Sequence, residues 1–147
     1  MAFRFTLAPL LRLRQSIERQ RTLKLQEVNL QVARAQETLA QLERSLSDSA
    51  QSDSAGLQAG RTAADLQFAS LIRENLHRFR QQLQSDIRKL ELLRQQALAE
   101  YDQAYRDREA LETLRARQRR AYQQEQLRRR QQELDATYLL QRWHRRN

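Results

Sequence analysis

Apolar residues recur along two stretches of the chain with alternating spacings of three and four. In the first stretch the series consists of Leu25, Val28, Val32, Ala35, Leu39, Leu42 and Leu46. In the second it consists of Ile72, Leu76, Phe79 and Leu83, followed in a shifted phase by Ile87, Leu90, Arg94, Ala97, Tyr101 and Ala104. This spacing places each series on one face of a helix. The sequence therefore predicts two long helices that pack through narrow seams.

A small, polar stretch separates the two series. Residues 47–60 are rich in Ser, Asp and Ala and contain both glycines of the chain, a composition typical of a turn. Thr62 followed three residues later by Asp65 is a helix start signal, and Pro9 marks the first turn of the first helix. We therefore expect helix one at about residues 6–48, the turn at about 49–61 and helix two at about 62–143.

Leu10, Leu13 and Ile17 keep the same spacing upstream of the first series but in another phase, because Ile17, Arg21 and Leu25 are four and four residues apart. Such an insertion is a stutter, which locally unwinds a supercoil, and the second series contains one too. The stutters centre on Arg21 and Leu83. In a chain that folds back on itself, the position numbers of facing residues add up to a constant. The two stutter positions predict a constant of about 104, and the two ends of the polar stretch predict about 107. Phe3 would then face residues 101–104, the helices would unwind at the same level, and residues after Tyr105 would lack a partner helix. The predicted fold is an all-α, antiparallel two-helix coiled-coil hairpin with a longer, protruding C-terminal helix.

Composition agrees with this fold and excludes others. The chain has 147 residues, of which 31% are charged and 6% aromatic. Val and Ile are scarce, and two glycines and one proline are too few to turn a set of short strands. The absence of cysteine excludes a disulfide framework and suits a reducing cytoplasm.

The sequence shows no enzyme chemistry. Its two histidines, His77 and His144, lie far apart, and a glycine-rich phosphate loop is impossible. Glu74 and His77 have the Glu-x-x-His spacing of di-iron bundles, but a second such pair and further carboxylates are missing. We expect no catalytic residue, no metal site and no cofactor.

Basic residues gather in the last third of the chain. Residues 105–147 contain twelve Arg and six acids, which is +6 of the total net charge of +9. The Arg residues form clusters at 115–120, at 128–130 and around Trp143. Three interpretations stay open: a solvated helix face paired with its own Glu residues, a surface that binds nucleic acid, and a surface for an acidic, possibly ring-shaped, protein partner.

The amino terminus adds a resemblance. The run Phe3-Arg4-Phe5-Thr6-Leu7-Ala8-Pro9-Leu10-Leu11-Arg12-Leu13-Arg14 is similar to the opening of the bacterial FliJ family, Phe-x-Phe-x-Leu-x-x-Leu-Leu-x-Leu-Arg. Size, a polar turn that ends in Ala-Gly, Arg61, Phe68 and a basic, Gln-rich tail extend the resemblance over nearly the whole chain. The residues Thr62-Ala63-Ala64-Asp65 stand where that family often has more aromatic residues.

The resemblance implies a non-enzymatic stalk of the flagellar type III export apparatus. Its partners would be the hexameric export ATPase FliI at the open end, the export gate protein FlhA near the turn, and export chaperones. The protein would be cytoplasmic and peripherally associated with the inner membrane at the flagellar base, reaching the membrane only through partners, and no nucleic acid is expected. The alternatives are an injectisome stalk homologue and a basic coiled-coil protein that binds nucleic acid or a membrane surface.

Residue assignments follow from this geometry. The expected ATPase-ring contact consists of Leu10, Leu11, Arg12, Leu13, Arg14, Arg115, Arg117, Arg119 and Arg120. The expected gate contact consists of Phe68, Ile72 and Leu42. Phe68 lies outside the seam series and either contacts the gate or packs against Leu42 or the turn, whereas Phe79 lies in the seam series and is expected in the core.

Overall fold

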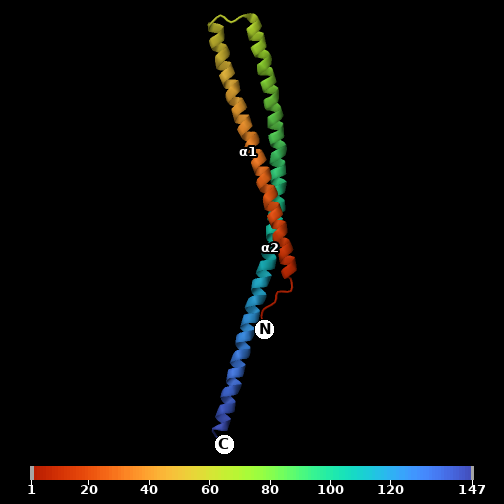
Figure 1. Cartoon of the computed structure of the whole chain (residues 1–147), viewed down its shortest axis with the longest axis vertical. Coiled ribbons are helices and arrows are strands. Elements are labelled where there is room, and N and C mark those ends of the chain that lie inside the picture. The colour runs from red at the N-terminus through yellow and green to blue at the C-terminus, as the bar shows by residue number, and fades with distance from the viewer. Residues whose placement is uncertain (1, 147) are drawn as a thin grey trace. The chain divides into compact units, whose positions relative to one another are not determined.

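The structure, a computed structural model, describes residues 2–146 and contains two long helices. Helix α1 spans Ala8–Gln58, 51 residues, and helix α2 spans Ala63–His144, 82 residues (Figure 1). No strand occurs among the described residues. The prediction of an all-α fold of two packed helices is confirmed, and helix two begins and ends within a residue of its predicted bounds.

The chain divides into two compact units, and both helices contribute to each. One consists of residues 20–102 and contains the connection between the helices, and we call it the turn unit. The other consists of residues 2–19 and 103–146, and we call it the terminal unit. Each is described by itself below.

Just after helix α1 ends, a glycine takes up a left-handed backbone conformation. Gly60 has a φ of +82°, and the Arg61 N–H donates to the Gly56 carbonyl at 3.2 Å. This six-residue closure satisfies a carbonyl that the helix leaves unpaired. The Asp65 N–H then donates to the Thr62 hydroxyl at 3.3 Å, while that hydroxyl donates to the Asp65 carboxylate at 2.7 Å. The predicted start signal at Thr62 is confirmed.

The predicted turn at residues 49–61 is wrong for residues 49–58, which are helical. The inward positions of α1 continue through Leu46, Ser49, Asp53 and Gly56 with spacings of three, four and three, so the seam persists although its side chains are small or polar. Asp53 stays paired there, because Arg61 and Arg73 both reach its carboxylate. Polar composition alone therefore does not mark the end of a helix whose periodicity continues.

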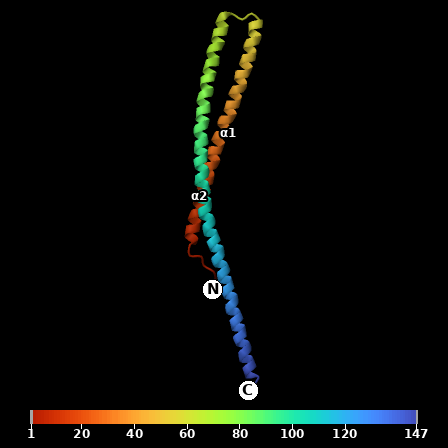
Figure 2. The same cartoon turned by 180° about the vertical axis from the view of Figure 1, so that it is seen from behind.

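The two helices of the turn unit run antiparallel and side by side (Figures 1 and 2). A thin apolar core forms where Val28 and Val32 of α1 meet Ala97 of α2, with Leu25 and Leu90 packed against it. Val32 and Ala97 are each only 2% exposed. The small Ala97 lets the two backbones approach each other, which suits a two-helix seam with no third layer.

The register of the pairing differs from the predicted one. Arg21 pairs with Glu100, Glu43 with Arg80 and Asp53 with Arg73, so the position numbers of facing residues add up to between 121 and 126. The two stutters therefore do not lie at the same level, because Arg21 pairs with Glu100 and does not face Leu83. The displacement follows directly from the late turn: moving the reversal toward residue 61 shifts every facing pair along α2.

Candidate functional site

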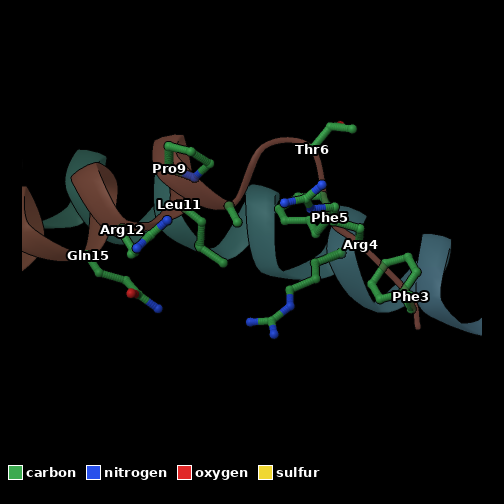
Figure 3. Close-up of a pocket in the computed structure, with 10 residues that line it drawn as sticks. Phe3, Arg4, Phe5, Thr6, Pro9, Leu11, Arg12 and Gln15 are labelled. Atoms are coloured by element: carbon green, nitrogen blue, oxygen red, sulfur yellow. The ribbon is translucent and has the colours of Figure 1, made fainter. Parts of the chain in front are cut away.

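The terminal unit begins with a short aromatic segment that lies against α2. Phe5 and Leu11 are the buried side chains of this segment, at 7% and 3% exposed, and Figure 3 shows both directed toward the α2 ribbon. The Ala8 N–H donates to the Phe5 carbonyl at 3.2 Å, which closes the bend into α1. The Phe3 ring lies 5.8 Å from the Tyr122 ring of α2. The predicted position of Phe3 opposite residues 101–104 is therefore wrong.

A groove opens beside this segment. It has a volume of about 720 Å³. Its apolar wall includes Phe3, Phe5 and Leu11, and its basic side includes Arg4, Arg12 and Arg115. Figure 3 shows the Arg4 side chain directed away from Thr6 and along the outside of the segment. Apolar walls beside several guanidinium groups suit an acidic peptide segment that also carries an apolar side chain.

Ion pairs replace apolar contacts where α1 residues 14–18 meet α2. Arg14 pairs with Asp107 at 3.1 Å. Arg108 is the centre of a second group, pairing with Glu18, with Glu112 at 2.6 Å and with Glu109 at 3.4 Å. The expectation that residues after Tyr105 lack a partner is therefore wrong.

Arg108 is held in its charged state by these neighbours. Desolvation lowers its pKa, but the hydrogen bond that Arg108 donates to Glu18 and the charges of Glu112, Glu18 and Glu109 outweigh this effect, so the pKa is raised. Its side chain is 17% exposed and its guanidinium lies 5.0 Å from the centre of the Tyr105 ring. A cation in this position holds α1 and α2 together in one register, since a shifted register would separate it from Glu18.

A second set of cations in the terminal unit is exposed and has no such partners. Arg115, Arg117, Arg119 and Arg120 are all exposed. Among residues 2–146, their side chains make no ion pair or hydrogen bond. The reason lies in the sequence, because no acid stands three or four residues from Arg117, Arg119 or Arg120. The solvated-face interpretation, which requires internal Glu partners, does not apply to these three.

The next Arg cluster does have an internal partner. Arg128 and Arg129 both pair with Glu125, at 3.2 and 3.0 Å. The hydrogen bond from Arg129, followed by the charge of Arg128, lowers the pKa of the Glu125 carboxyl. Every residue from 127 to 146 is exposed, and no ion pair, hydrogen bond or ring contact within the described chain joins this segment to α1.

The expected ATPase-ring residues are thus brought into one unit but differ in access. Leu10, Arg12 and Leu13 are exposed, as are the four Arg residues of α2. Leu11 is buried, and Arg14 is engaged with Asp107. Sequence reasoning missed the pairing residues Glu18, Asp107 and Arg108. These residues could have been found from the opposite charges that stand at seam positions of the two helices. Such charges can be matched across the seam only when the register is correct.

The turn unit carries an exposed row of apolar side chains on α2. Phe68, Ile72 and Phe79 lie four and seven residues apart and are 67%, 44% and 50% exposed. We call these three residues the apolar stripe. The prediction that Phe79 is a core residue is wrong, because the neighbouring Arg80 turns inward toward Glu43 in its place. Phe68 lies outside the seam as predicted, whereas Leu42 is 7% exposed and contributes core rather than surface.

The described residues provide no metal site and no membrane span. No group of three or more His, Asp or Glu within residues 2–146 is arranged to hold a metal ion. No helix in this part of the chain is long and apolar enough to cross a membrane.

Comparison with known proteins gives one match. Residues 3–147 match the family model described as Flagellar FliJ protein. No curated protein and no solved structure matches the chain. The match covers the aromatic segment, both helices and the basic part of α2.

Proposed function

The chain belongs to the FliJ family, and we propose that it is the central stalk that links the flagellar export ATPase to the export gate. The family supplies the general role, that of a non-enzymatic component of flagellar protein export. The surfaces of the two units support the finer assignment. In this role the protein acts in the cytoplasm, at the inner membrane beneath the flagellum, and export chaperones are further partners.

The ATPase contact is assigned to the basic surface of the terminal unit. The observation that carries it is the set of exposed cations Arg115, Arg117, Arg119 and Arg120, none of which is neutralised within the described chain. Guanidinium groups pair with carboxylates in planar, two-point contacts. An acidic inner surface of the FliI hexamer would supply those carboxylates, and the exposed Leu10 and Leu13 would add apolar contact.

A charge reversal tests this contact. Arg117, Arg119 and Arg120 are changed together to Glu, and capture of FliI is measured with purified proteins and from lysate treated with nuclease. Like charges that face each other at a contact cost several kcal/mol, so binding of the Glu variant to an acidic surface should fall by about a hundredfold or more. The matched control changes Arg34, Arg78 and Arg88 to Glu, which are three exposed Arg residues of the turn unit.

The control separates a local contact from general attraction between a basic and an acidic protein. Retained binding in the control and loss in the first variant support the assignment. Equal losses in both variants, or unchanged FliI binding with loss of retention on DNA, would reject it. The second outcome would favour the nucleic-acid interpretation of the same cations.

The gate contact is assigned to the apolar stripe of the turn unit. Exposed aromatic side chains aligned on one helix face are typical of a helix that binds in an apolar groove. Phe68 and Ile72 were expected here from the sequence, and Phe79 extends their row by two turns. Leu42 is left out of this assignment because its side chain is buried. FlhA is the proposed partner for this surface.

A further inference from the structure

The end of α2 carries an apolar face that is exposed within the terminal unit. Ala136, Leu139, Leu140 and Trp143 stand at spacings of three, one and three, which places them on one side of the last turns of the helix. We call these four residues the tip face. Leu139, Leu140 and Trp143 are 62%, 63% and 60% exposed. Apolar side chains on one face of a helix stabilise it only when something buries that face.

Beyond Asp135 the end of the chain carries only positive charge. Asp135 is the last acid of the chain, and Arg142, Arg145 and Arg146 follow it. Residues 136–146 therefore carry +3 with no internal counter-charge. Arg142 stands on the polar flank of the helix, and Arg145 and Arg146 lie in the turn that follows α2. Long Arg side chains can reach sideways from an apolar face to the phosphates at a surface.

We propose that the tip face binds directly to an anionic lipid surface, lying in the interface rather than crossing it. Trp and Leu on one face of a helix, with Arg on its flank and just beyond its end, suit a helix that lies in a membrane interface. Each basic residue adds attraction to anionic headgroups. The proposal goes beyond the stalk role, in which the membrane is reached only through partners, and it can fail while that role stands.

A second copy of the chain fits the tip face less well. Two tips side by side would bring together +3 and +3 with no acid after Asp135 to separate them. The face also offers only four apolar residues, whereas a stable interface buries about 1,200 Å² or more. An anionic surface answers both objections, because it supplies the missing negative charge and needs only a shallow apolar insertion.

The chain carries its own reporter for this contact. Trp143 is the single Trp, so tryptophan emission reports on the tip alone. The full-length protein is titrated with vesicles of phosphatidylcholine and with vesicles containing equal parts of phosphatidylcholine and phosphatidylglycerol. A shift of the emission to shorter wavelength and co-sedimentation are expected with the anionic vesicles and not with the neutral ones. High salt should weaken the binding, because salt screens the Arg residues.

Two pairs of variants test charge and apolar contact separately. Changing Arg142, Arg145 and Arg146 to Gln should weaken vesicle binding at least about tenfold, whereas the same change at Arg128, Arg129 and Arg130 should have a much smaller effect. Changing Leu139 and Leu140 to Ser should abolish the emission shift. Leu134→Ser, on the opposite side of the helix, should leave it in place. Circular dichroism checks that helix content is retained in each variant.

Several outcomes would overturn the proposal. The first two are the absence of binding to anionic vesicles and equal binding to neutral vesicles. A third is an equal loss of vesicle binding in the two Arg variants, because that would show that the vesicles are attracted to the basic chain as a whole. An emission shift with duplex DNA or RNA but not with vesicles would assign the tip to nucleic acid instead. Concentration-dependent self-association that buries Trp143 without vesicles would assign it to a second copy.

Discussion

The change Phe68→Ala tests whether the apolar stripe is a binding surface or a packing surface. Phe68 is 67% exposed, so about a third of its side chain is buried. Full burial of a Phe is worth about 1.5–3 kcal/mol, and the folded state should therefore lose roughly 1 kcal/mol or less. Alanine regains about 0.5 kcal/mol in helix propensity. The net change in the free energy of unfolding should be close to zero.

The comparison variant is Leu42→Ala, in the seam of the same unit. Leu42 is 7% exposed, and truncating a buried Leu costs about 2–5 kcal/mol. In a chain of this size each kcal/mol lowers the melting temperature by about 2–4 °C. Thermal melts followed by circular dichroism should therefore show a shift of several degrees for Leu42→Ala and almost none for Phe68→Ala.

Binding to FlhA should respond in the opposite order. An aromatic residue at the centre of an interface is often worth about 2 kcal/mol or more, so Phe68→Ala should weaken binding about thirtyfold. Titration calorimetry with the soluble part of FlhA measures this. The matched control is Leu92→Ala, a similarly exposed apolar residue on another face of α2. The reasoning fails if Phe68→Ala lowers the melting temperature as Leu42→Ala does, or if FlhA binds both exposed-residue variants equally.

Two further changes test the structure. Gly60→Ala should lower the free energy of unfolding, measured with denaturant, by about 1–2 kcal/mol because residue 60 has a positive φ. Gly56→Ala should cost much less, because the gain from Ala in a helix offsets the displacement of the Arg61 side chain. Similar losses of stability in the two variants would contradict the left-handed cap. Arg108→Gln should destabilise the chain by about 1–3 kcal/mol, because it removes the cation that pairs with the carboxylates of Glu18 and Glu112. Adding Glu18→Gln to this variant should recover part of the lost stability. Strictly additive effects of the two changes would contradict the pairing.

Helix type and most helix boundaries could be predicted from the sequence, because they depend on local periodicity and capping. Thr62 and Asp65 form their hydrogen bonds where the start signal placed them. The end of α1 was harder to predict because Ser49 and Asp53 look like turn residues when taken singly. Asp53 is stabilised in the helix by Arg61 and Arg73, and such contacts across the chain cannot be read from local composition.

An error of about ten residues in the end of α1 became an error in the whole register. The sum of the stutter positions, Arg21 and Leu83, matched the sum for the early turn, but this agreement was a coincidence. With α1 continuing to Gln58, Arg21 meets Glu100 and Arg80 meets Glu43. Charge complementarity across the seam would have selected this register, since it pairs opposite charges at each of these levels.

The candidate surfaces were predicted in part. The Arg residues at 115–120 are exposed as expected, because their charge and their lack of nearby acids are properties of the sequence itself. The apolar stripe was only half predicted. Phe79 shares the phase of the seam, but Arg80 takes the inward position beside it. The choice between two adjacent inward positions depends on the partner helix, and Glu43 makes Arg80 the better fit there.

Partner binding to the basic part of α2 should be coupled to the stability of that helix. The terminal unit buries only Phe5, Leu11 and Ala104 below the surface, and half-exposed ion pairs such as Arg14–Asp107 contribute about 0–1 kcal/mol each. Residues 127–146 are exposed throughout, and a helix without tertiary contacts is marginal in water. A partner that binds the helical form alone therefore stabilises it by mass action. The free energy needed to order the helix lowers the affinity for the partner. Substitutions at exposed positions that touch no partner can therefore still change binding, because they change helix propensity.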